Sequence, residues 1–181
     1  MPRAMIRNAT IHDIPVMQAI INSHAELGKM LFKSLAALYE HLRDFAVYEE
    51  NGEVLGCAAL TIIWADLAEV RSLAVDGDHT GRGIGRKLVE WTIEEARRLG
   101  IRKIMSLTYE KRFFEKLNFE VVEKEALPLK VWSDCVRCPK RDNCDEIAMV
   151  LTLDDVPVVN VPSAIPTPRG LSIPVLDHLE D

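Results

Sequence analysis

Hydrophobic and polar positions along the chain follow two periods, one typical of strands and one typical of helices. Residues 67–75, Leu-Ala-Glu-Val-Arg-Ser-Leu-Ala-Val, alternate aliphatic and other side chains with the period of a half-buried strand. After a polar loop, apolar residues recur at helical spacing from Ile84 to Leu99, and Gly100 ends the segment. The centre of the sequence therefore predicts a strand, a glycine-containing loop and a helix in succession.

The same two periods predict the elements on either side of this central unit. The other predicted strands are residues 4–9, 44–50, 53–64, 103–108, 119–122 and 147–153. Two further helices are expected after the capping residues Thr10 and Ser34, and a short one begins at Arg112. Asn51-Gly52 is typical of the tight turn of a hairpin. The order β-α-α-β-β-β-α-β-α-β-β predicts an α/β (α+β) fold, a mixed sheet with helices on its faces.

Composition and charge narrow the class of protein. The chain has 181 residues, 48% apolar and 28% charged, which is ordinary for one soluble globular domain. A net charge of −6 argues against nucleic acid or an anionic membrane as the main partner. No stretch approaches the roughly 20 apolar residues of a membrane span, and residues 1–7 lack the apolar core of a signal peptide. Four cysteines in such a chain predict cytoplasmic thiols or metal ligands.

A shift in composition predicts where the domain ends. Residues 1–153 contain all the predicted elements, whereas residues 154–181 are rich in proline. We therefore predict a domain over 1–153 and an extended tail over 154–181, because proline disfavours both helix and central strand. Such a tail is either disordered or lies over a neighbouring subunit, which is compatible with a homodimer.

The glycine loop between the central strand and its helix predicts an anion site. It reads Gly81-Arg82-Gly83-Ile84-Gly85-Arg86, which lacks the Gly-x-Gly-x-x-Gly spacing of dinucleotide sites and the Gly-Lys-Ser/Thr of a Walker loop. Glycines also end strands and cap helices for structural reasons alone. A loop between strand and helix nevertheless presents backbone N–H groups and the positive helix end, so phosphate binding is the favoured interpretation.

Two charged residues interrupt the central strand. Strict alternation places Glu69 and Arg71 on one face with Leu67, Leu73 and Val75, about 7 Å apart along the strand. One interpretation is an ion pair of Glu69 with Arg71 or a lysine at a sheet edge. The other is a general base, since a carboxylate in an apolar cleft has a raised pKa suited to accepting a proton.

Other polar residues have weaker patterns. His24 lies on the apolar stripe of the first helix, where a histidine at the edge of the core is the favoured interpretation. Residues 28–33, which join the first two helices, carry Lys29 and Lys33, either solvated or able to hold a carboxylate. Gly56 predicts a bulge or a close backbone approach, and Cys57 a small core residue.

A cysteine-rich loop over residues 135–144 stands between the last two predicted strands. Cys135 and Cys138 form a Cys-x-x-Cys pair, and Cys144 is a third potential ligand. A closed zinc site needs four ligands, so Asp145 or a group from a second subunit would have to complete it. Metal binding, by zinc or an iron–sulfur group, and three free or oxidised thiols are equally supported.

Two sets of motifs resemble one enzyme family. Residues 80–86 resemble the acetyl-CoA loop of GNAT N-acetyltransferases, Gln/Arg-x-x-Gly-x-Gly/Ala, with Thr80 at its first position. Residues 56–60 and 68–75, together with 28–38, 106–119 and 126–128, look like the acetyltransferase domain of N-acetylglutamate synthases, including the short bacterial forms. The resemblance covers residues 5–153 and implies the GNAT fold, with a mostly antiparallel central sheet.

The resemblance implies roles for particular residues. Glu69 matches the acidic general base, and Thr108 matches a hydroxyl residue that serves the departing thiolate. Phe114 stands where many GNAT enzymes have a tyrosine as general acid. Residues expected to bind acetyl-CoA are Leu73, Ala74, Val75, Gly81, Arg82, Gly83, Ile84, Gly85, Arg86 and Phe114. Residues expected to bind the acceptor are Leu31, Lys33, Arg71 and Arg141.

The function expected from the resemblance is acetyl transfer from acetyl-CoA to the α-amine of an amino acid, L-glutamate first and L-glutamine or another small amino acid next. Such an enzyme would act in arginine biosynthesis. Two alternatives remain open from the residues: a GNAT enzyme for a protein or polyamine amine, and a CoA-binding sensor without turnover. A polyamine acceptor would favour an acidic cleft, which Lys29 and Lys33 oppose.

Overall fold

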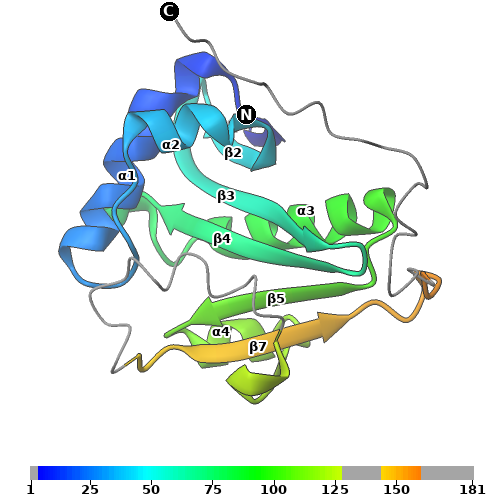
Figure 1. Ribbon diagram of the computed structural model, residues 1–181. Coiled ribbons are helices and arrows are strands. Elements are labelled where there is room, and N and C mark those ends of the chain that lie inside the picture. Colours follow the sequence, from blue (N-terminus) through cyan, green and yellow to red (C-terminus); the bar gives the residue numbers. More distant parts are fainter. Residues whose placement is uncertain (1–3, 128–143, 160–181) are drawn as a thin grey trace, which may run out of the picture.

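The sheet at the centre of the fold has the strand order β1-β2-β3-β4-β5-β7-β6 in the computed structural model, which describes residues 4–127 and 144–159. Figure 1 shows the arrangement. The strands are β1 (Ala4–Asn8), β2 (Phe45–Glu50), β3 (Glu53–Trp64), β4 (Leu67–Val75), β5 (Lys103–Thr108), β6 (Glu120–Val121) and β7 (Ile147–Thr152). The α-helices are α1 (Ile14–Glu26), α2 (Leu35–Glu40), α3 (Ile84–Leu99) and α4 (Lys111–Glu115), with short 3₁₀ turns at Ile11–Asp13, Leu42–Asp44, Gly77–His79 and Lys124–Ala126.

The predicted order of elements is confirmed, and so is the mixed, mostly antiparallel sheet. Every strand pair is antiparallel except β4 with β5. The Ser34 hydroxyl caps α2 as predicted, by accepting a hydrogen bond from the Ala37 N–H. The strand predicted over 119–122 is reduced to Glu120–Val121, which are in register with Val150 and Met149 of β7. Asn51 and Gly52 have positive φ, as the predicted hairpin turn requires.

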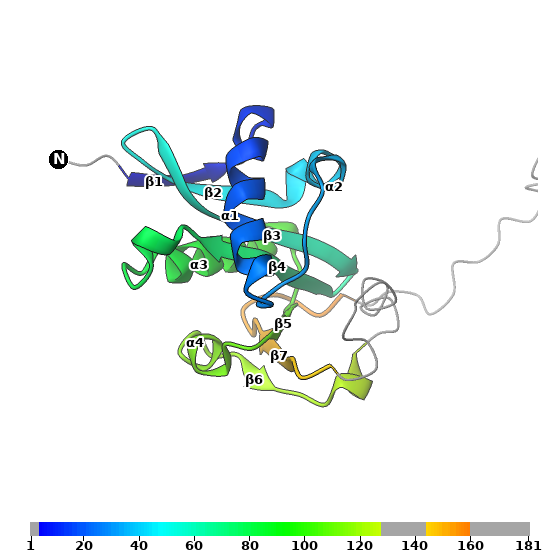
Figure 2. The same cartoon turned by 90° about the vertical axis from the view of Figure 1, so that its left-hand side faces the viewer.

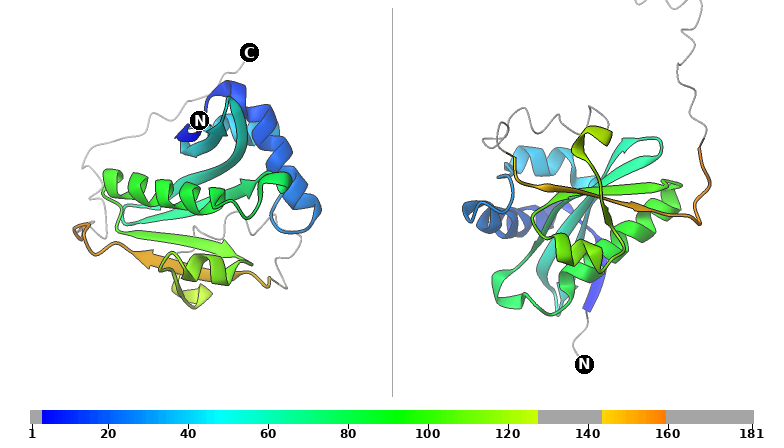
Figure 3. Two further views of the ribbon diagram at one scale, coloured as in Figure 1. Left: turned by 180° about the vertical axis from the view of Figure 1, so that it is seen from behind. Right: turned by 90° about the horizontal axis from the view of Figure 1, so that it is seen from below.

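Helices cover both faces of the sheet (Figures 1 and 3). On one face, α1 and α2 pack over β2 and β3 around Met17, Leu38 and Val47, which are buried. On the other, α3 and α4 pack over β4 and β5 around Val89 and Phe114. Cys57 is fully buried in the first of these clusters, and burial raises the pKa of its thiol to about 12. The prediction of Cys57 as a core residue is therefore confirmed.

Strands β4 and β5 are paired only at one end. Their parallel register comprises Leu67 with Lys103, Ala68 with Ile104 and Glu69 with Met105. Beyond these pairs the two strands separate toward their carboxyl ends, as Figure 1 shows. Figure 2 views the molecule from the side where they are apart, with α1 and its connection to α2 in front. The sheet is thereby opened at the end of β4 that carries the glycine loop.

A β-bulge in β4 changes which side chains share a face. Cys57 of β3 is opposite Ala74, but Ala59 is opposite Arg71, so β4 contains one extra residue in this interval. Ser72 within the bulge has a φ of 50°. The expected common face of Glu69 and Arg71 with Leu73 and Val75 is therefore wrong. Leu73 and Val75 pack on the α3 side, whereas Ala74 takes the α1 side.

The bulge and close approach predicted at Gly56 are both present. The register of β2 against β3 shifts between Tyr48, opposite Gly56, and Glu49, opposite Val54. A Cβ at Gly56 would lie 3.0 Å from the Ala74 carbonyl oxygen and 3.2 Å from a methyl group of Leu88. Gly56 therefore permits β3, β4 and α3 to pack tightly beneath the glycine loop.

The described part of the tail begins as a continuation of the domain. Val156 is buried in the core, and its carbonyl accepts a hydrogen bond from the Arg102 guanidinium. Asp154 and Asp155 form ion pairs with Arg102 and Arg97. Packing thus extends past the predicted boundary at Leu153, and residues 160–181 lie outside the described part. In the described part, no helix is long and apolar enough to cross a membrane.

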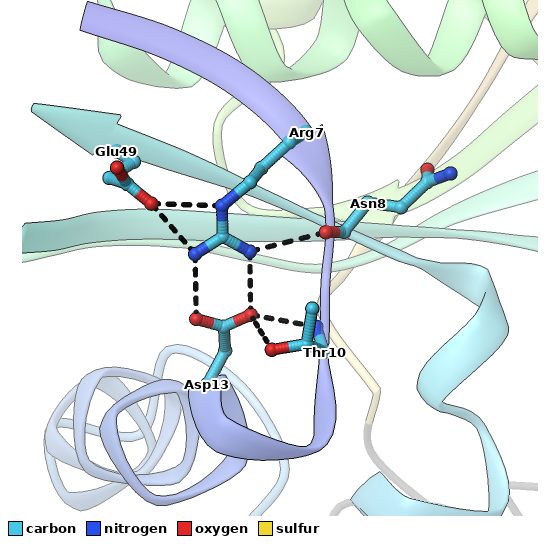
Figure 4. A network of polar contacts seen from close by, with 5 residues as sticks. All are labelled: Arg7, Asn8, Thr10, Asp13 and Glu49. Atoms are coloured by element: carbon cyan, nitrogen blue, oxygen red, sulfur yellow. Dashed lines mark hydrogen bonds and ion pairs between the residues drawn. The ribbon is translucent and has the colours of Figure 1, made fainter. Parts of the chain in front are cut away.

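A charged network joins β1, β2 and the start of α1 (Figure 4). The Arg7 guanidinium contacts both carboxylate oxygens of Asp13, at 2.7 and 2.9 Å, and also donates to Glu49 at 2.8 Å. The N–H and hydroxyl of Thr10 donate to the same Asp13 carboxylate at 2.7 and 2.9 Å. These hydrogen bonds, that from Arg7 first, lower the pKa of the buried Asp13 from 3.8 to about 2.

We expect Asp13→Asn to lower the free energy of unfolding at pH 7 by about 2 kcal/mol, because one unit of pKa shift corresponds to about 1.4 kcal/mol. The folded pKa lies below the unfolded one, so this stability is present above the unfolded value and is lost as pH falls through about 2. Urea unfolding of both proteins between pH 7 and pH 2 measures the difference. Asp155→Asn, at an exposed ion pair with Arg97, is the control and should lose little. An equal loss in both variants would contradict the prediction.

Candidate functional site

A large cleft opens where β4 and β5 separate. Its volume is about 2230 Å³, compared with roughly 300–1,000 Å³ for most small-molecule sites. It therefore has room for two reactants. The predicted site residues that line it are Leu31, Lys33, Glu69, Arg71, Leu73, Ala74, Val75, Gly81, Gly83, Ile84, Gly85, Arg86, Thr108, Phe114 and Cys144.

Glu69 is at the apex of this opening. It is the last residue of β4 in register with β5, where it is opposite Met105, and on its other side it is opposite Thr61 of β3. Its side chain is 6% exposed, and one carboxylate oxygen lies 2.7 Å from the Arg71 Nε. The ion pair considered from the sequence therefore exists, in the interior of the sheet and on the wall of the cleft. A buried carboxylate at this point can accept a proton from a group bound in the cleft.

Basic side chains of the α1–α2 connection line the same cleft. The connection contributes Lys29 and Lys33, together with the apolar Leu31, and β4 contributes Arg71. The structure thus brings Lys33 and Arg71, 38 residues apart in sequence, to one cleft with Glu69. Cations lining a cleft favour an anionic ligand, because carboxylate or phosphate groups form charge-assisted hydrogen bonds with them.

The carboxyl end of β5 forms the opposite wall. Thr108 is buried, and its hydroxyl accepts a hydrogen bond from the Glu110 N–H at 2.9 Å. A hydroxyl that accepts in this way keeps its own proton as a donor. Tyr109, which sequence reasoning missed, also lines the cleft. The sequence offers only a weak signal for it, its position directly after Thr108 at the end of a predicted strand.

Left-handed glycines shape the loop between β4 and α3. Gly81 and Gly83 have φ values of 76° and 77°, and Gly83 is the residue that precedes the first turn of α3. Ile84, Gly85 and Arg86, in that first turn, line the cleft, and Ile84 is also anchored in the core. The loop therefore presents backbone N–H groups and the amino end of a long helix to the cleft, which suits a phosphate.

Arg82 differs from its neighbours in the loop. Its guanidinium donates to both carboxylate oxygens of Glu50, at 3.0 and 2.8 Å, and it is not among the residues that line the cleft. Because the Arg82 side chain is directed to β2, only the Arg82 backbone is placed to contribute to the predicted phosphate binding.

The end of β4 borders the cleft with its backbone. Leu73, Ala74 and Val75 lie beyond the last residue that pairs with β5, so an extended ligand can align along this edge. The His24 Nε2 lies 2.7 Å from the Val75 carbonyl oxygen, and His24 also lines the cleft. His24 thus fastens α1 to the end of β4, a role that its place on the apolar stripe does not indicate.

Phe114, on α4, lines the cleft. The residue is 3% exposed, and its ring makes edge contacts of 5.1 Å between centroids with both Phe113 and Phe119. A buried phenylalanine cannot transfer a proton, so any protonation of a leaving group must involve another residue or water.

Four further residues of the predicted site belong to the cysteine loop. Cys135, Cys138 and Arg141 lie outside the described residues. Cys144 is a free, half-buried thiol 3.9 Å from a carboxylate oxygen of Glu146. Among residues 4–127 and 144–159, no group of three or more potential ligands is arranged to hold a metal ion.

Residues of other elements also line the cleft without a signal in the sequence. Lys124, Glu146 and Thr61 all line it. The Lys124 Nζ donates to the Cys144 carbonyl at 3.1 Å, and the Thr61 hydroxyl donates to an Asp44 carboxylate oxygen at 3.1 Å. These residues come from elements far apart in sequence, so only the packing of the sheet brings them together.

Comparison with known proteins agrees with this geometry. The model of the acetyltransferase (GNAT) family matches residues 13–119, from the residue before α1 to the residue before β6. The matched range includes β4, the glycine loop and α3, which form one side of the cleft. It also includes the carboxyl end of β5 and Thr108.

Three similar proteins carry informative names. An uncharacterized N-acetyltransferase of Chlorobaculum tepidum is 42% identical over 148 residues, which are 82% of this chain and 96% of that protein. An amino-acid acetyltransferase of Mycobacterium tuberculosis is 35% identical over 139 residues, 75% of this chain and 79% of that one.

The third is a solved structure, the N-acetylglutamate synthase of Neisseria gonorrhoeae complexed with coenzyme A and N-acetyl-glutamate. It superposes with a TM-score of 0.76 at 29% identity, covering 83% of this chain and 35% of that one. The family model covers more than half of the chain, and two relatives exceed 30% identity over more than two thirds of it. The chain therefore belongs to the acetyltransferase (GNAT) family.

Proposed function

We propose that this protein transfers the acetyl group of acetyl-CoA to the α-amine of L-glutamate, and so acts in arginine biosynthesis. The observation that carries the proposal is the position of Glu69, a buried carboxylate where β4 and β5 separate, in one cleft with Lys33 and Arg71. The names of the Mycobacterium tuberculosis and Neisseria gonorrhoeae relatives support an amino acid as the acceptor.

Acetyl-CoA fits the half of the cleft that β4 and α3 form. Its pyrophosphate would lie against the backbone N–H groups around Gly81 and Gly83 and the amino end of α3. Its pantetheine arm would align with the edge of β4 at Leu73, Ala74 and Val75. This placement directs the thioester toward the apex at Glu69.

The reaction then needs the acyl transfer and the loss of two protons from the acceptor nitrogen. Glu69 takes a proton from the substrate ammonium, directly or through water, and the neutral amine nitrogen attacks the thioester carbonyl carbon. A backbone N–H near Leu73 stabilises the oxyanion of the tetrahedral intermediate. The carbonyl re-forms as the carbon–sulfur bond breaks, the nitrogen passes its second proton to water, and CoA leaves as thiolate. The Thr108 hydroxyl, on the facing wall, is available to donate to the sulfur.

The charges of the cleft select the acceptor. An acidic amino acid carries two carboxylates, and Lys33 and Arg71 supply two cations on the walls of the cleft beside Glu69. Each cation can form a charge-assisted hydrogen bond with one carboxylate. A polyamine would place its positive charges against these cations and would be disfavoured.

Thiol release from acetyl-CoA, measured with each of a panel of free amino acids, tests the proposal. We expect the highest kcat/KM with L-glutamate, a lower value with L-glutamine, which lacks the second negative charge, and little release with spermidine or a lysine-containing peptide. Faster release with the peptide or the polyamine would overturn the choice of acceptor. Binding of acetyl-CoA without turnover of any amine would instead support a sensor.

A further inference from the structure

The side chain of Asn22 binds both backbone groups of Lys33. The Lys33 N–H donates to the Asn22 Oδ1 at 2.9 Å, and the Asn22 Nδ2 donates to the Lys33 carbonyl at 3.1 Å. The Gln18 Nε2 donates to the same carbonyl at 3.1 Å. Gln18 and Asn22 are one turn apart on α1 and therefore share a face. Neither residue lines the cleft, so any effect that they have on it passes through Lys33.

These hydrogen bonds replace the partners that a strand or helix would supply. Residues 31–34 have no regular secondary structure, yet the backbone groups of Lys33, which is half-buried, require partners. A primary amide is suited to this task, because it presents one acceptor and one donor side by side. A carboxylate or an alkyl side chain at position 22 would satisfy only part of the requirement or none of it.

The connection between α1 and α2 is fixed at its two ends by other means. The Lys29 N–H donates to the His24 carbonyl at 3.1 Å, which continues the end of α1. Ser34 begins α2 as its capping residue. Between these points, the Asn22 amide is attached to the one residue of the connection whose side chain is predicted to bind a substrate carboxylate. Leu31, the other predicted substrate contact, lies two residues before it.

We propose that Asn22, assisted by Gln18, is a positioning residue that holds the Lys33 backbone so that the Lys33 ammonium and the Leu31 side chain are set for the acceptor amino acid. This inference rests on the proposed function for the identity of the acceptor. Both of these Asn22 hydrogen bonds go to Lys33, on the acceptor side of the cleft, and not to the glycine loop or the β4 edge.

The expected effect is confined to the binding of the acceptor. Without the two hydrogen bonds of Asn22, the connection between α1 and α2 gains conformational freedom. Binding of the acceptor must then order this connection, which weakens the binding free energy. We expect Asn22→Ala to raise the KM for L-glutamate about tenfold, which corresponds to a loss of about 1.4 kcal/mol of binding free energy. The kcat and the KM for acetyl-CoA should stay at their wild-type values.

Three further variants sharpen the test. Asn22→Asp keeps the shape and the acceptor for the Lys33 N–H but removes the donor to the Lys33 carbonyl. It should therefore also raise the KM for L-glutamate. Gln18→Ala removes one of the two donors and should have a smaller effect. Ser23→Ala is the matched control, because Ser23 is exposed on the same turn of α1 and its hydroxyl donates to the Ile20 carbonyl of its own helix.

Hydrogen exchange of the Lys33 amide provides a readout that is independent of turnover. Exchange should be faster in Asn22→Ala than in the wild type and unchanged in Ser23→Ala. Unchanged exchange in Asn22→Ala, or faster exchange with an unchanged KM for L-glutamate, would overturn the inference. If the wild-type protein acetylates no amino acid, the proposed function fails, and hydrogen exchange alone then tests the positioning of Lys33. Faster exchange in Asn22→Ala would support it, and unchanged exchange would overturn it.

Discussion

Replacing Glu69 with glutamine should lower kcat by roughly 10²–10⁴-fold, the range that general base catalysis contributes. Glutamine has nearly the same shape, so it can occupy the same buried position at the apex of the cleft, but it cannot take a proton from the acceptor ammonium. The amine then remains protonated and has no lone pair for the attack. Steady-state thiol release with saturating L-glutamate and acetyl-CoA measures the loss.

Two controls separate a lost base from a damaged fold. The affinity for acetyl-CoA, measured by calorimetry, should be unchanged in Glu69→Gln, because the predicted cofactor contacts lie on the edge of β4 and in the glycine loop. Glu125→Gln changes an exposed carboxylate at the rim of the same cleft and should keep the wild-type rate. Wild-type turnover by Glu69→Gln would exclude Glu69 as the general base, and lost acetyl-CoA affinity would indicate a structural role beside Arg71.

Gly83→Ala should raise the KM for acetyl-CoA by roughly 5- to 30-fold, because a side chain in the left-handed region costs about 1–2 kcal/mol. Gly83 has a φ of 77° and directly precedes α3. The surrounding space is open, with nothing within 4 Å of a Cβ placed there, so the loop can relieve the strain by moving. Movement of the loop would turn its N–H groups away from the pyrophosphate.

Gly77→Ala is a matched control for this substitution. Gly77 is in the same connection between β4 and α3, and a Cβ there also meets nothing within 4 Å, but its φ is not positive. It should therefore bind acetyl-CoA as the wild type does. An unchanged KM in Gly83→Ala, or an equal rise in both variants, would show that the left-handed conformation of Gly83 is not what binds the cofactor. The KM for L-glutamate provides an internal reference in both proteins.

Most of the fold could be predicted because its elements follow local patterns. The period of residues 67–75, the helical stripe from Ile84 and the Asn51-Gly52 turn each depend on neighbours within a few residues. The cap of α2 at Ser34 has the same local origin. Such signals are readable without knowing which segments will pack together. They also identified Glu69, since a carboxylate on an apolar strand is costly unless it has a partner or a role.

The site itself was only partly predictable, because its members meet through packing. The sequence indicated Lys33, Arg71, Glu69 and Thr108 separately and through a family resemblance, but not that one opening joins them. That opening exists because β4 and β5 pair over three residue pairs and then separate. Tyr109 was missed although it follows Thr108, since the end of a predicted strand does not reveal which neighbour borders it.

By itself, then, the sequence determined the order of the elements, the glycine loop and the candidate base, all of which depend on short-range periodicity and backbone preference. The tertiary structure decided the rest. The bulge at Ser72 reversed the expected faces of Leu73 and Val75, because strand register is a property of two strands. The pairing of Arg82 with Glu50 and the hydrogen bonds of Asn22 to Lys33 join residues of separate elements. Such contacts are fixed by the three-dimensional path of the chain, on which a local pattern carries no information.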